Sequence, residues 1–340
     1  MPTIPLLPSQ ANCDLMRDIA QFPPLSTLLA SFVLMSILLL PLMGWLILRI
    51  AKNQLYHLNT RILLIIHCGG IFVHCLDRIF LHSSDLYNWH VEMYETSSCD
   101  IISTSERCFS LRLFLNIGMF VAIYTMPTLV VERCLATSKV ATYQTNRTAW
   151  TWLLMFQTCL ATWFLGLIYS QTTFGGTAVY CIAAREAVPF NMLLAFSMSI
   201  IVQTVSYSGF RYLVYKNKKL KTLLQNRGSA LTKRYQVEES LRSLETISLP
   251  IHMMYIFEVF HSLSSFLFLN FNALMPRPWY YFWMELSACL PEYAIAFFIA
   301  FVIQEKKLQK KGKTSLRREM EVNPDQYFDQ YNRVWTTGQA

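Results

Sequence analysis

The sequence has few charged residues. Only 15% of its 340 residues are Asp, Glu, Lys or Arg, whereas 54% are hydrophobic and the mean hydropathy is +0.32. Soluble domains usually carry about 25% charged residues. The deficit argues against a pair of soluble domains and indicates a surface that faces lipid. We expect neither a nucleic-acid partner nor a cofactor.

Two further features are missing. The nine cysteines include no CxxC pair and no metal-type spacing, which argues against a zinc site or a disulfide-rich scaffold. Residues 1–24 hold no basic n-region, so they do not read as a signal peptide, and we expect the first span to direct insertion. An early helix is expected to be interrupted by Pro2, Pro5, Pro8, Pro23 and Pro24.

Long apolar runs dominate the remainder of the chain. A membrane-spanning helix needs about 20 mostly apolar residues. Enough runs of that length are present to predict an all-α membrane protein, a seven-transmembrane helix bundle over 25–303, with an extracellular segment 1–24 and a cytoplasmic tail 304–340. The predicted spans are 25–50, 60–81, 108–131, 149–169, 189–215, 246–270 and 280–303.

Basic residues are distributed unevenly over the predicted loops. In the seven-span arrangement, every lysine and most arginines fall on the side of the tail. Basic residues accumulate on the cytoplasmic side of membranes, which predicts an outside N-terminus and a cytoplasmic C-terminus. The sequon Asn146-Arg147-Thr148 then lies in a cytoplasmic loop, out of reach of glycosylation.

An acid–arginine pair, Glu132-Arg133, ends the third predicted span. An arginine held there in an ion pair can be released when helices rearrange, so we interpret the pair as a coupling switch. The alternative is a positive-inside arginine beside an acid. The charged amphipathic run 231–244 predicts an extension of span six, on which Glu238 or Glu245 is a candidate partner for Arg133.

Cysteines on the outer side are disulfide candidates. Cys108 precedes Arg133 by about 37 Å of helix, which places it at the outer end of span three. Because the exterior is oxidising, a bond from Cys108 to Cys181 in the second outer loop is favoured, with Cys99 as the competing partner. Cys13 is paired or free. Free thiols are expected at Cys68, Cys75, Cys134, Cys159 and Cys289.

Ionisable and polar side chains interrupt the apolar spans. A charge inside a bilayer costs a few kcal/mol, so such residues are candidates for function. The predicted ligand-binding residues are Asp77, Arg112, Asn116, Gln203, His261 and Glu285. Two interpretations stay open. The outer members line a cavity between helices, or they pair with one another, as Arg112 with Glu285 or Asp77, and only hold the bundle together.

Further polar residues are assigned to the switching core or to packing. Glu258 and Glu292 lie deeper, and Pro291 is expected to loosen span seven and free a carbonyl that a moving helix can use. His67, His74 and Asp77 share one face of span two. They could hold a metal, but helix packing explains them more simply. The basic run after Ile303 is expected to attract anionic lipid.

A family resemblance rests on three stretches: Glu132-Arg-Cys-Leu-Ala-Thr137, Arg234-Tyr-Gln-Val-Glu-Glu-Ser-Leu-Arg-Ser243 and Tyr327-Phe-Asp-Gln-Tyr-Asn-Arg-Val-Trp335. They resemble nematode serpentine chemoreceptors of the Sra superfamily, of class alpha or alpha-beta-like (ab), with classes epsilon and beta as close alternatives. The chain departs from rhodopsin-like receptors at Cys134, where they carry an aromatic, and at Pro291-Glu292-Tyr293, which replaces their Asn-Pro-x-x-Tyr.

The resemblance implies a GPCR-like receptor in the plasma membrane of ciliated sensory neurons. It would detect a small environmental molecule and signal through a heterotrimeric G protein, and it would not be an enzyme. The alternative is a ligand-gated channel or transporter. The intramembrane acids support it, but the sequence shows no internal repeat of hydropathy, which argues against it. The sequence leaves dimerisation open.

Overall fold

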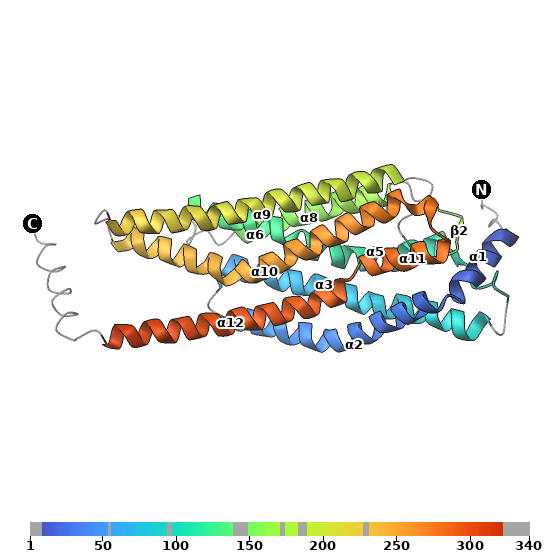
Figure 1. Cartoon of the computed structure of the whole chain (residues 1–340), viewed down its shortest axis with the longest axis horizontal. Coiled ribbons are helices and arrows are strands. Elements are labelled where there is room, and N and C mark those ends of the chain that lie inside the picture. The colour runs from blue at the N-terminus through green and yellow to red at the C-terminus, as the bar shows by residue number, and fades with distance from the viewer. Residues whose placement is uncertain are drawn as a thin grey trace, which may run out of the picture.

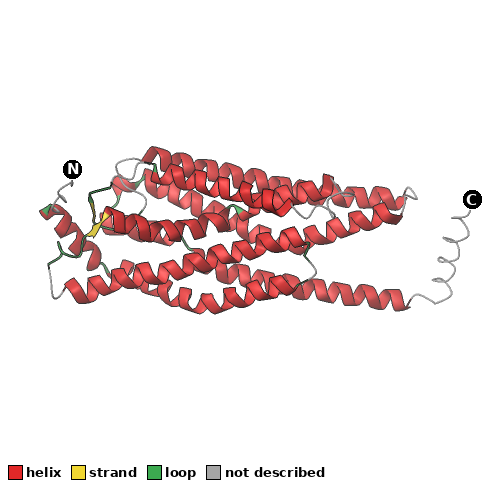
Figure 2. Cartoon of the chain, turned by 180° about the vertical axis from the view of Figure 1, so that it is seen from behind, coloured by secondary structure: helices red, strands yellow, loops and turns green. Residues whose placement is uncertain are grey.

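The computed structural model describes residues 9–53, 56–93, 97–138, 149–170, 174–182, 189–226 and 231–321. Seven of the described segments are helical, long and apolar enough to cross a membrane, which confirms the predicted seven-helix bundle. They run along the length of an elongated bundle (Figures 1 and 2). The segments are Pro23–Lys52, Leu58–Glu92, Ser105–Ser138, Trp150–Tyr169, Phe190–Leu224, Ser240–Asn270 and Arg277–Lys310.

The described elements are helices apart from one two-stranded sheet, whose strands lie far apart in the sequence. The helices are α1 (Gln10–Ala20), α2 (Pro23–Lys52), α3 (Leu58–Tyr87), η1 (Asn88–Glu92), α5 (Ser105–Ile123), α6 (Thr125–Ser138), α8 (Ala149–Tyr169), α9 (Pro189–Asn226), α10 (Leu231–Asn270), η2 (Asn272–Leu274), α11 (Arg277–Ser287) and α12 (Leu290–Glu321). The strands β1 (Ser103–Thr104) and β2 (Thr177–Ala178) pair antiparallel.

The two ends of the bundle differ. Figure 1 shows α1 and the strands at one end, which we call the α1 end. The C-terminal part of α12 lies at the opposite end, which we call the α12 end, together with the C-terminal part of α9 and the N-terminal part of α10. There α10 begins at Leu231 and continues into the sixth span, as the amphipathic pattern predicts. The sequon at Asn146 and the stretch 327–335 lie outside the described residues.

A short helix precedes the first span, so the expectation that prolines interrupt an early helix was wrong. None of these prolines lies within α1, and the Ser9 hydroxyl caps its start by accepting a hydrogen bond of 3.3 Å from the Asn12 N–H. Pro23 instead opens α2, where a missing N–H costs nothing. Met16 and Ile19 of α1 are buried in one apolar cluster with residues of the α1 end of the bundle.

Two spans are broken, each near a proline. A proline has no N–H to donate to the carbonyl four residues earlier. For Pro127 that carbonyl belongs to Ile123, the last residue of α5, and for Pro291 it belongs to Ser287, the last residue of α11. The third span therefore divides into α5 and α6 and the seventh into α11 and α12, a division that the predicted continuous spans do not contain.

Glycines allow α3 and α5 to approach closely. A Cβ atom added to Gly118 would lie 2.6 Å from the carbonyl oxygen of Gly70, and one added to Gly70 would lie 2.7 Å from that of Gly118. On the outside of the bundle, large apolar side chains are exposed, with Trp152 and Phe190 each 70% exposed. Such a surface suits hydrocarbon rather than water.

Candidate functional site

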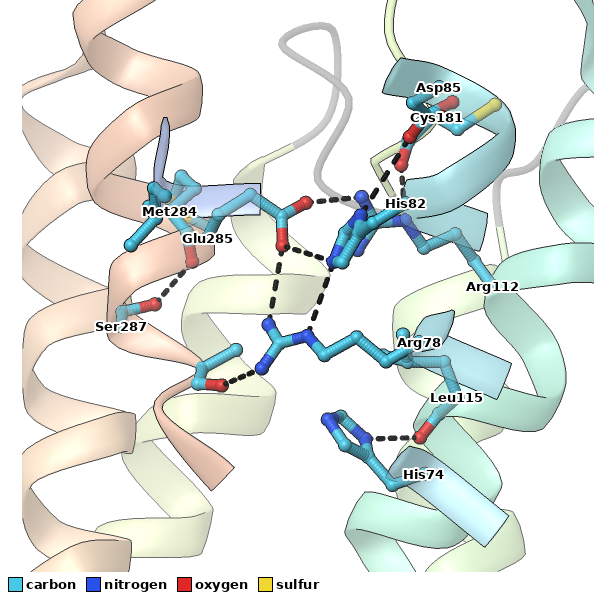
Figure 3. Close-up of polar contacts among 12 residues, drawn as sticks. His74, Arg78, His82, Asp85, Arg112, Leu115, Cys181, Met284, Glu285 and Ser287 are labelled. Atoms are coloured by element: carbon cyan, nitrogen blue, oxygen red, sulfur yellow. Dashed lines mark hydrogen bonds and ion pairs between the residues drawn. The ribbon is translucent and has the colours of Figure 1, made fainter. Parts of the chain in front are cut away.

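A buried cluster of charged side chains lies toward the α1 end, around Glu285 of α11 (Figure 3). Its carboxylate accepts hydrogen bonds from Arg112 of α5 and from the Tyr180 hydroxyl, the latter at 2.9 Å. Arg78 of α3 lies 3.5 Å away and His82 lies 3.7 Å away. Because Glu285, Arg78 and Arg112 are all buried, one carboxylate balances parts of two guanidinium charges away from water.

The segment after β2 covers this cluster. Burial and the neighbouring Glu285 raise the pKa of Tyr180 well above its usual value, so its hydroxyl remains a hydrogen-bond donor. The Arg112 Nε donates to the backbone carbonyl of Cys181. Arg112 therefore holds both the covering segment and α11.

The break in the seventh span supplies further acceptors to the cluster. The Ser287 carbonyl, which Pro291 deprives of its N–H partner, accepts a 2.9 Å hydrogen bond from His261 Nδ1 of α10. The adjacent Ala288 carbonyl accepts a 3.0 Å hydrogen bond from Arg78 Nη1. Polar side chains of α3 and α10 thus satisfy the backbone where the helix is interrupted.

A cavity lies beside this cluster, between α5, α9, α10 and α11. It holds about 530 Å³ of space not occupied by atoms, its opening included. Among the predicted ligand-binding residues, Arg112, Asn116, His261 and Glu285 line it. Most of the remaining wall is apolar: Leu115, Met119, Phe120, Ile168, Ile182, Met192, Phe196 and Met284. The Arg112–Glu285 pair forms part of this wall, so pairing between helices and lining of the cavity coincide at these two residues.

Two other predicted ligand residues lie elsewhere. Asp77 is half-buried on α3 and is not among the described residues that line the cavity. Gln203 of α9 is not among them either, and its Nε2 donates a 3.1 Å hydrogen bond to the Ile123 carbonyl, the one that Pro127 leaves without its partner. Gln203 thus does for the break in span three what His261 does for the break in span seven.

Two disulfides join segments of the chain at the α1 end. Cys108, in the first turns of α5, is bonded to Cys181, and Cys13 of α1 is bonded to Cys99. Cys99, considered as the competing partner for Cys181, is therefore engaged elsewhere. The free cysteines are Cys68, Cys75, Cys134, Cys159 and Cys289.

A second polar cluster lies toward the α12 end, around Arg133 of α6. The guanidinium donates to the adjacent Glu132 carboxylate and, at 2.7 Å, to the Thr60 hydroxyl of α3. It also donates to the hydroxyl of Ser243 on α10 at 2.5 Å. Arg133 is only 3% exposed. One buried arginine thereby connects the second, third and sixth spans.

The other predicted switch residues lie at several places along the bundle and do not form one site with Arg133. Glu238 of α10 makes a 2.5 Å ion pair with Lys221 of α9, and the backbone carbonyl of Glu245 accepts a hydrogen bond from Gln304 of α12. Glu258 is buried, and its Oε2 has no hydrogen-bond partner among the described residues. Glu292 is partly buried directly after Pro291.

Comparison with known families now identifies the chain. The family described as serpentine type 7TM GPCR receptor class ab chemoreceptor matches residues 10–336. The chain belongs to this family. It is also similar to serpentine receptor class alpha/beta-14 of Caenorhabditis elegans, with 21% identity over 276 residues, which cover 78% of this chain and 69% of that protein. The resemblance to the Sra superfamily is confirmed, and class ab is the class that matches.

The class ab family is a family of receptors, so the comparison supports a GPCR-like chemoreceptor and does not favour a channel or transporter. The histidines of span two also have structural partners in this receptor. His67 Nδ1 and His74 Nδ1 hydrogen-bond the carbonyls of Ala122 and Leu115 at 3.1 and 2.9 Å. Within the described ranges, no group of three or more His, Cys, Asp or Glu residues could hold a metal ion.

Three members of the receptor's charged cluster are not among the residues predicted from the sequence: Arg78, His82 and Tyr180. The first two carry a signal in their spacing, because His74, Arg78 and His82 recur every four residues and so share one face of α3. The face predicted to matter was instead that of His67, His74 and Asp77. Tyr180 lies in a loop, and no periodicity predicts its approach to Glu285.

Proposed function

We propose that this class ab receptor lies in the plasma membrane of sensory neurons with its α1 end outside. It detects a small molecule in the cavity beside Glu285 and couples to a heterotrimeric G protein at the α12 end. The orientation is supported by the lysines of α2, α9 and α12, which are at the α12 end and would face the cytosol.

The burial of Arg133 carries this proposal. Its hydrogen bonds to Thr60 and Ser243 hold the second, third and sixth spans together at the end where a G protein would enter. This arrangement is the resting state in our proposal, because the guanidinium that would meet the G protein is occupied. Activation separates α10 from α6 and releases Arg133.

The cavity is placed to bias that equilibrium. Its walls include α5, α10 and α11. Helix α10 itself extends to the α12 end, whereas α5 and α11 are joined through the breaks to α6 and α12. A ligand shifts the population only by its difference in affinity for the two arrangements. The breaks after Ile123 and Ser287 are the points at which the third and seventh spans can bend, since side-chain rather than helical hydrogen bonds complete the backbone there.

The decisive experiment removes the bond between α6 and α10. Ser243→Ala deletes one hydrogen bond to a charged group, worth about 1.5–3 kcal/mol. We expect ligand-independent coupling, measured by G-protein dissociation in transfected cells, to rise roughly ten-fold or more. Arg133→Ala is expected to abolish coupling while surface expression remains.

The matched control is Ser264→Ala, also on α10. The Ser264 hydroxyl hydrogen-bonds only its own helix, at the Phe260 and His261 carbonyls, among the described residues. It should leave basal coupling unchanged. If Ser243→Ala and Ser264→Ala behave alike, or if Arg133→Ala still couples at normal surface levels, the coupling proposal is refuted.

A further inference from the structure

The chemistry of the cavity wall specifies a class of ligand, an inference that rests on the proposed chemoreceptor function. Arg112 keeps an unused hydrogen-bond donor among the described residues. A guanidinium carries five N–H donors. Its Nε donates to the Cys181 carbonyl and its Nη2 donates to Glu285, whereas its Nη1 donates to no described residue. Because Arg112 lines the cavity, this donor is available to a bound molecule.

Glu285 has no oxygen to spare for the free Nη1 of Arg112. Arg78 and Arg112 are both buried, whereas Glu285 is the buried carboxylate they share. Both of its oxygens are occupied, since Oε1 accepts from Arg112 and Tyr180 and Oε2 faces Arg78 and His82. The neighbouring acids Asp77, Asp85 and Glu292 are partly buried, and one oxygen of each has no hydrogen-bond partner among the described residues. Because neither oxygen of Glu285 is free, the remaining donor of Arg112 is left for an acceptor that enters the cavity.

A second unpartnered atom lies on the same wall. His261 is 3% exposed, and its Nδ1 must carry the proton because the Ser287 carbonyl can only accept. Its Nε2 has no hydrogen-bond partner among the described residues. This nitrogen can accept a proton or a hydrogen bond from an acidic group that enters the cavity. Arg112 and His261 together favour a ligand whose head group is acidic rather than a hydrocarbon alone.

The apolar wall determines the remainder of the ligand. Met119, Phe120, Met192 and Phe196 line the same space and offer only hydrophobic contacts. We propose that the receptor binds small carboxylic acids, with the carboxylate on Arg112 and a short hydrocarbon chain or ring between α5 and α9. The disulfide from Cys108 to Cys181 and the Arg112–Cys181 contact hold the covering segment above the head group.

The first test uses the unaltered receptor, purified in detergent at neutral pH. Butanoate and hexanoate are compared with their methyl esters and with the alcohols of equal chain length, by thermal shift. A charge-assisted bond favours the acids, so they should raise the melting temperature at concentrations roughly ten-fold lower than the esters and alcohols. Equal effects of all three, or no shift with either acid up to about 10 mM, would overturn the proposal.

A second test alters the charge of the cluster. Glu285→Gln removes the carboxylate that competes for Arg112, so acids should bind more tightly, by roughly ten-fold, and should restore melting temperature lost through the substitution. The double variant Arg112→Met/Glu285→Gln deletes the pair without leaving an unbalanced charge and should lose the preference for acids. A merely structural role predicts no gain in acid binding for Glu285→Gln.

Glu305→Gln is the matched control, since Glu305 is a buried carboxylate paired with Arg49 at 2.7 Å, remote from the cavity. It should leave acid binding unchanged. Failure of the acid proposal is separable from failure of the receptor function. If neither acid shifts the melting temperature while Ser243→Ala still raises coupling, the ligand class is wrong and the function stands. If acids bind but no variant couples, the function is wrong.

Discussion

Replacement of Gly118 by alanine should destabilise the receptor strongly, because no side chain fits between α3 and α5. The added Cβ would lie 2.6 Å from the Gly70 carbonyl oxygen and 2.7 Å from the backbone nitrogen of His74. Both neighbours are backbone atoms, which cannot turn aside as a side chain can. Ordinary van der Waals contact begins near 3.4 Å, so the helices must separate by about 0.8 Å.

That separation would also break hydrogen bonds on either side of the contact. His74 Nδ1 and His67 Nδ1 reach the carbonyls of Leu115 and Ala122 at 2.9 and 3.1 Å, and an added 0.8 Å or so lengthens both beyond a useful hydrogen bond. Overpacking costs about 1–3 kcal/mol, and each lost bond inside a membrane about 0.6 kcal/mol. The expected loss is therefore about 2–4 kcal/mol.

The assay is thermal unfolding of purified receptor in detergent, together with surface expression. We expect Gly118→Ala to lower the melting temperature by on the order of 5 °C or more and to reduce expression. Gly69→Ala and Gly166→Ala are the controls, because an added Cβ at either position meets nothing within 4 Å. Equal melting temperatures for Gly118→Ala and Gly69→Ala would refute the close-approach argument.

Two further predictions concern contacts that the helix breaks and the α1 end create. Gln203→Leu leaves the Ile123 carbonyl without its donor and should cost about 1–3 kcal/mol, seen as a lower melting temperature, yet it should leave acid binding unchanged; a selective loss of binding would contradict the placement of Gln203 outside the cavity. Replacing Cys13 and Cys99 by serine opens a loop with a sequence separation of 86 and should lower stability by about 2–5 kcal/mol, measured by thermal unfolding; an unchanged melting temperature would show that the bond does not restrain α1.

Several features of the fold followed from the sequence because they depend on local composition. A run of apolar residues must be helical inside a bilayer, whatever its neighbours, since its backbone polar groups have no other partners. The seven spans were therefore predictable from length and hydropathy. The extension of α10 from Leu231 was predictable for a similar reason, because an amphipathic pattern extends along a single helix.

The breaks in the spans lay partly within reach of the sequence. Pro127 and Pro291 reveal which carbonyls lose a donor. They do not reveal whether the helix divides or which side chain replaces the donor. Gln203 and His261 occupy those positions only because α9 and α10 pack against the third and seventh spans at the right height.

The sequence by itself determined that lipid surrounds this protein, where its seven spans lie, and that a few charged residues within them needed an explanation. Only the tertiary structure decided the partners of those charges. Arg112, Glu285 and Tyr180 come from distant parts of the chain, and their meeting beside the cavity depends on helix packing and on a loop tied down by Cys181. Hydropathy and periodicity describe one helix at a time, whereas a binding site is a contact between several.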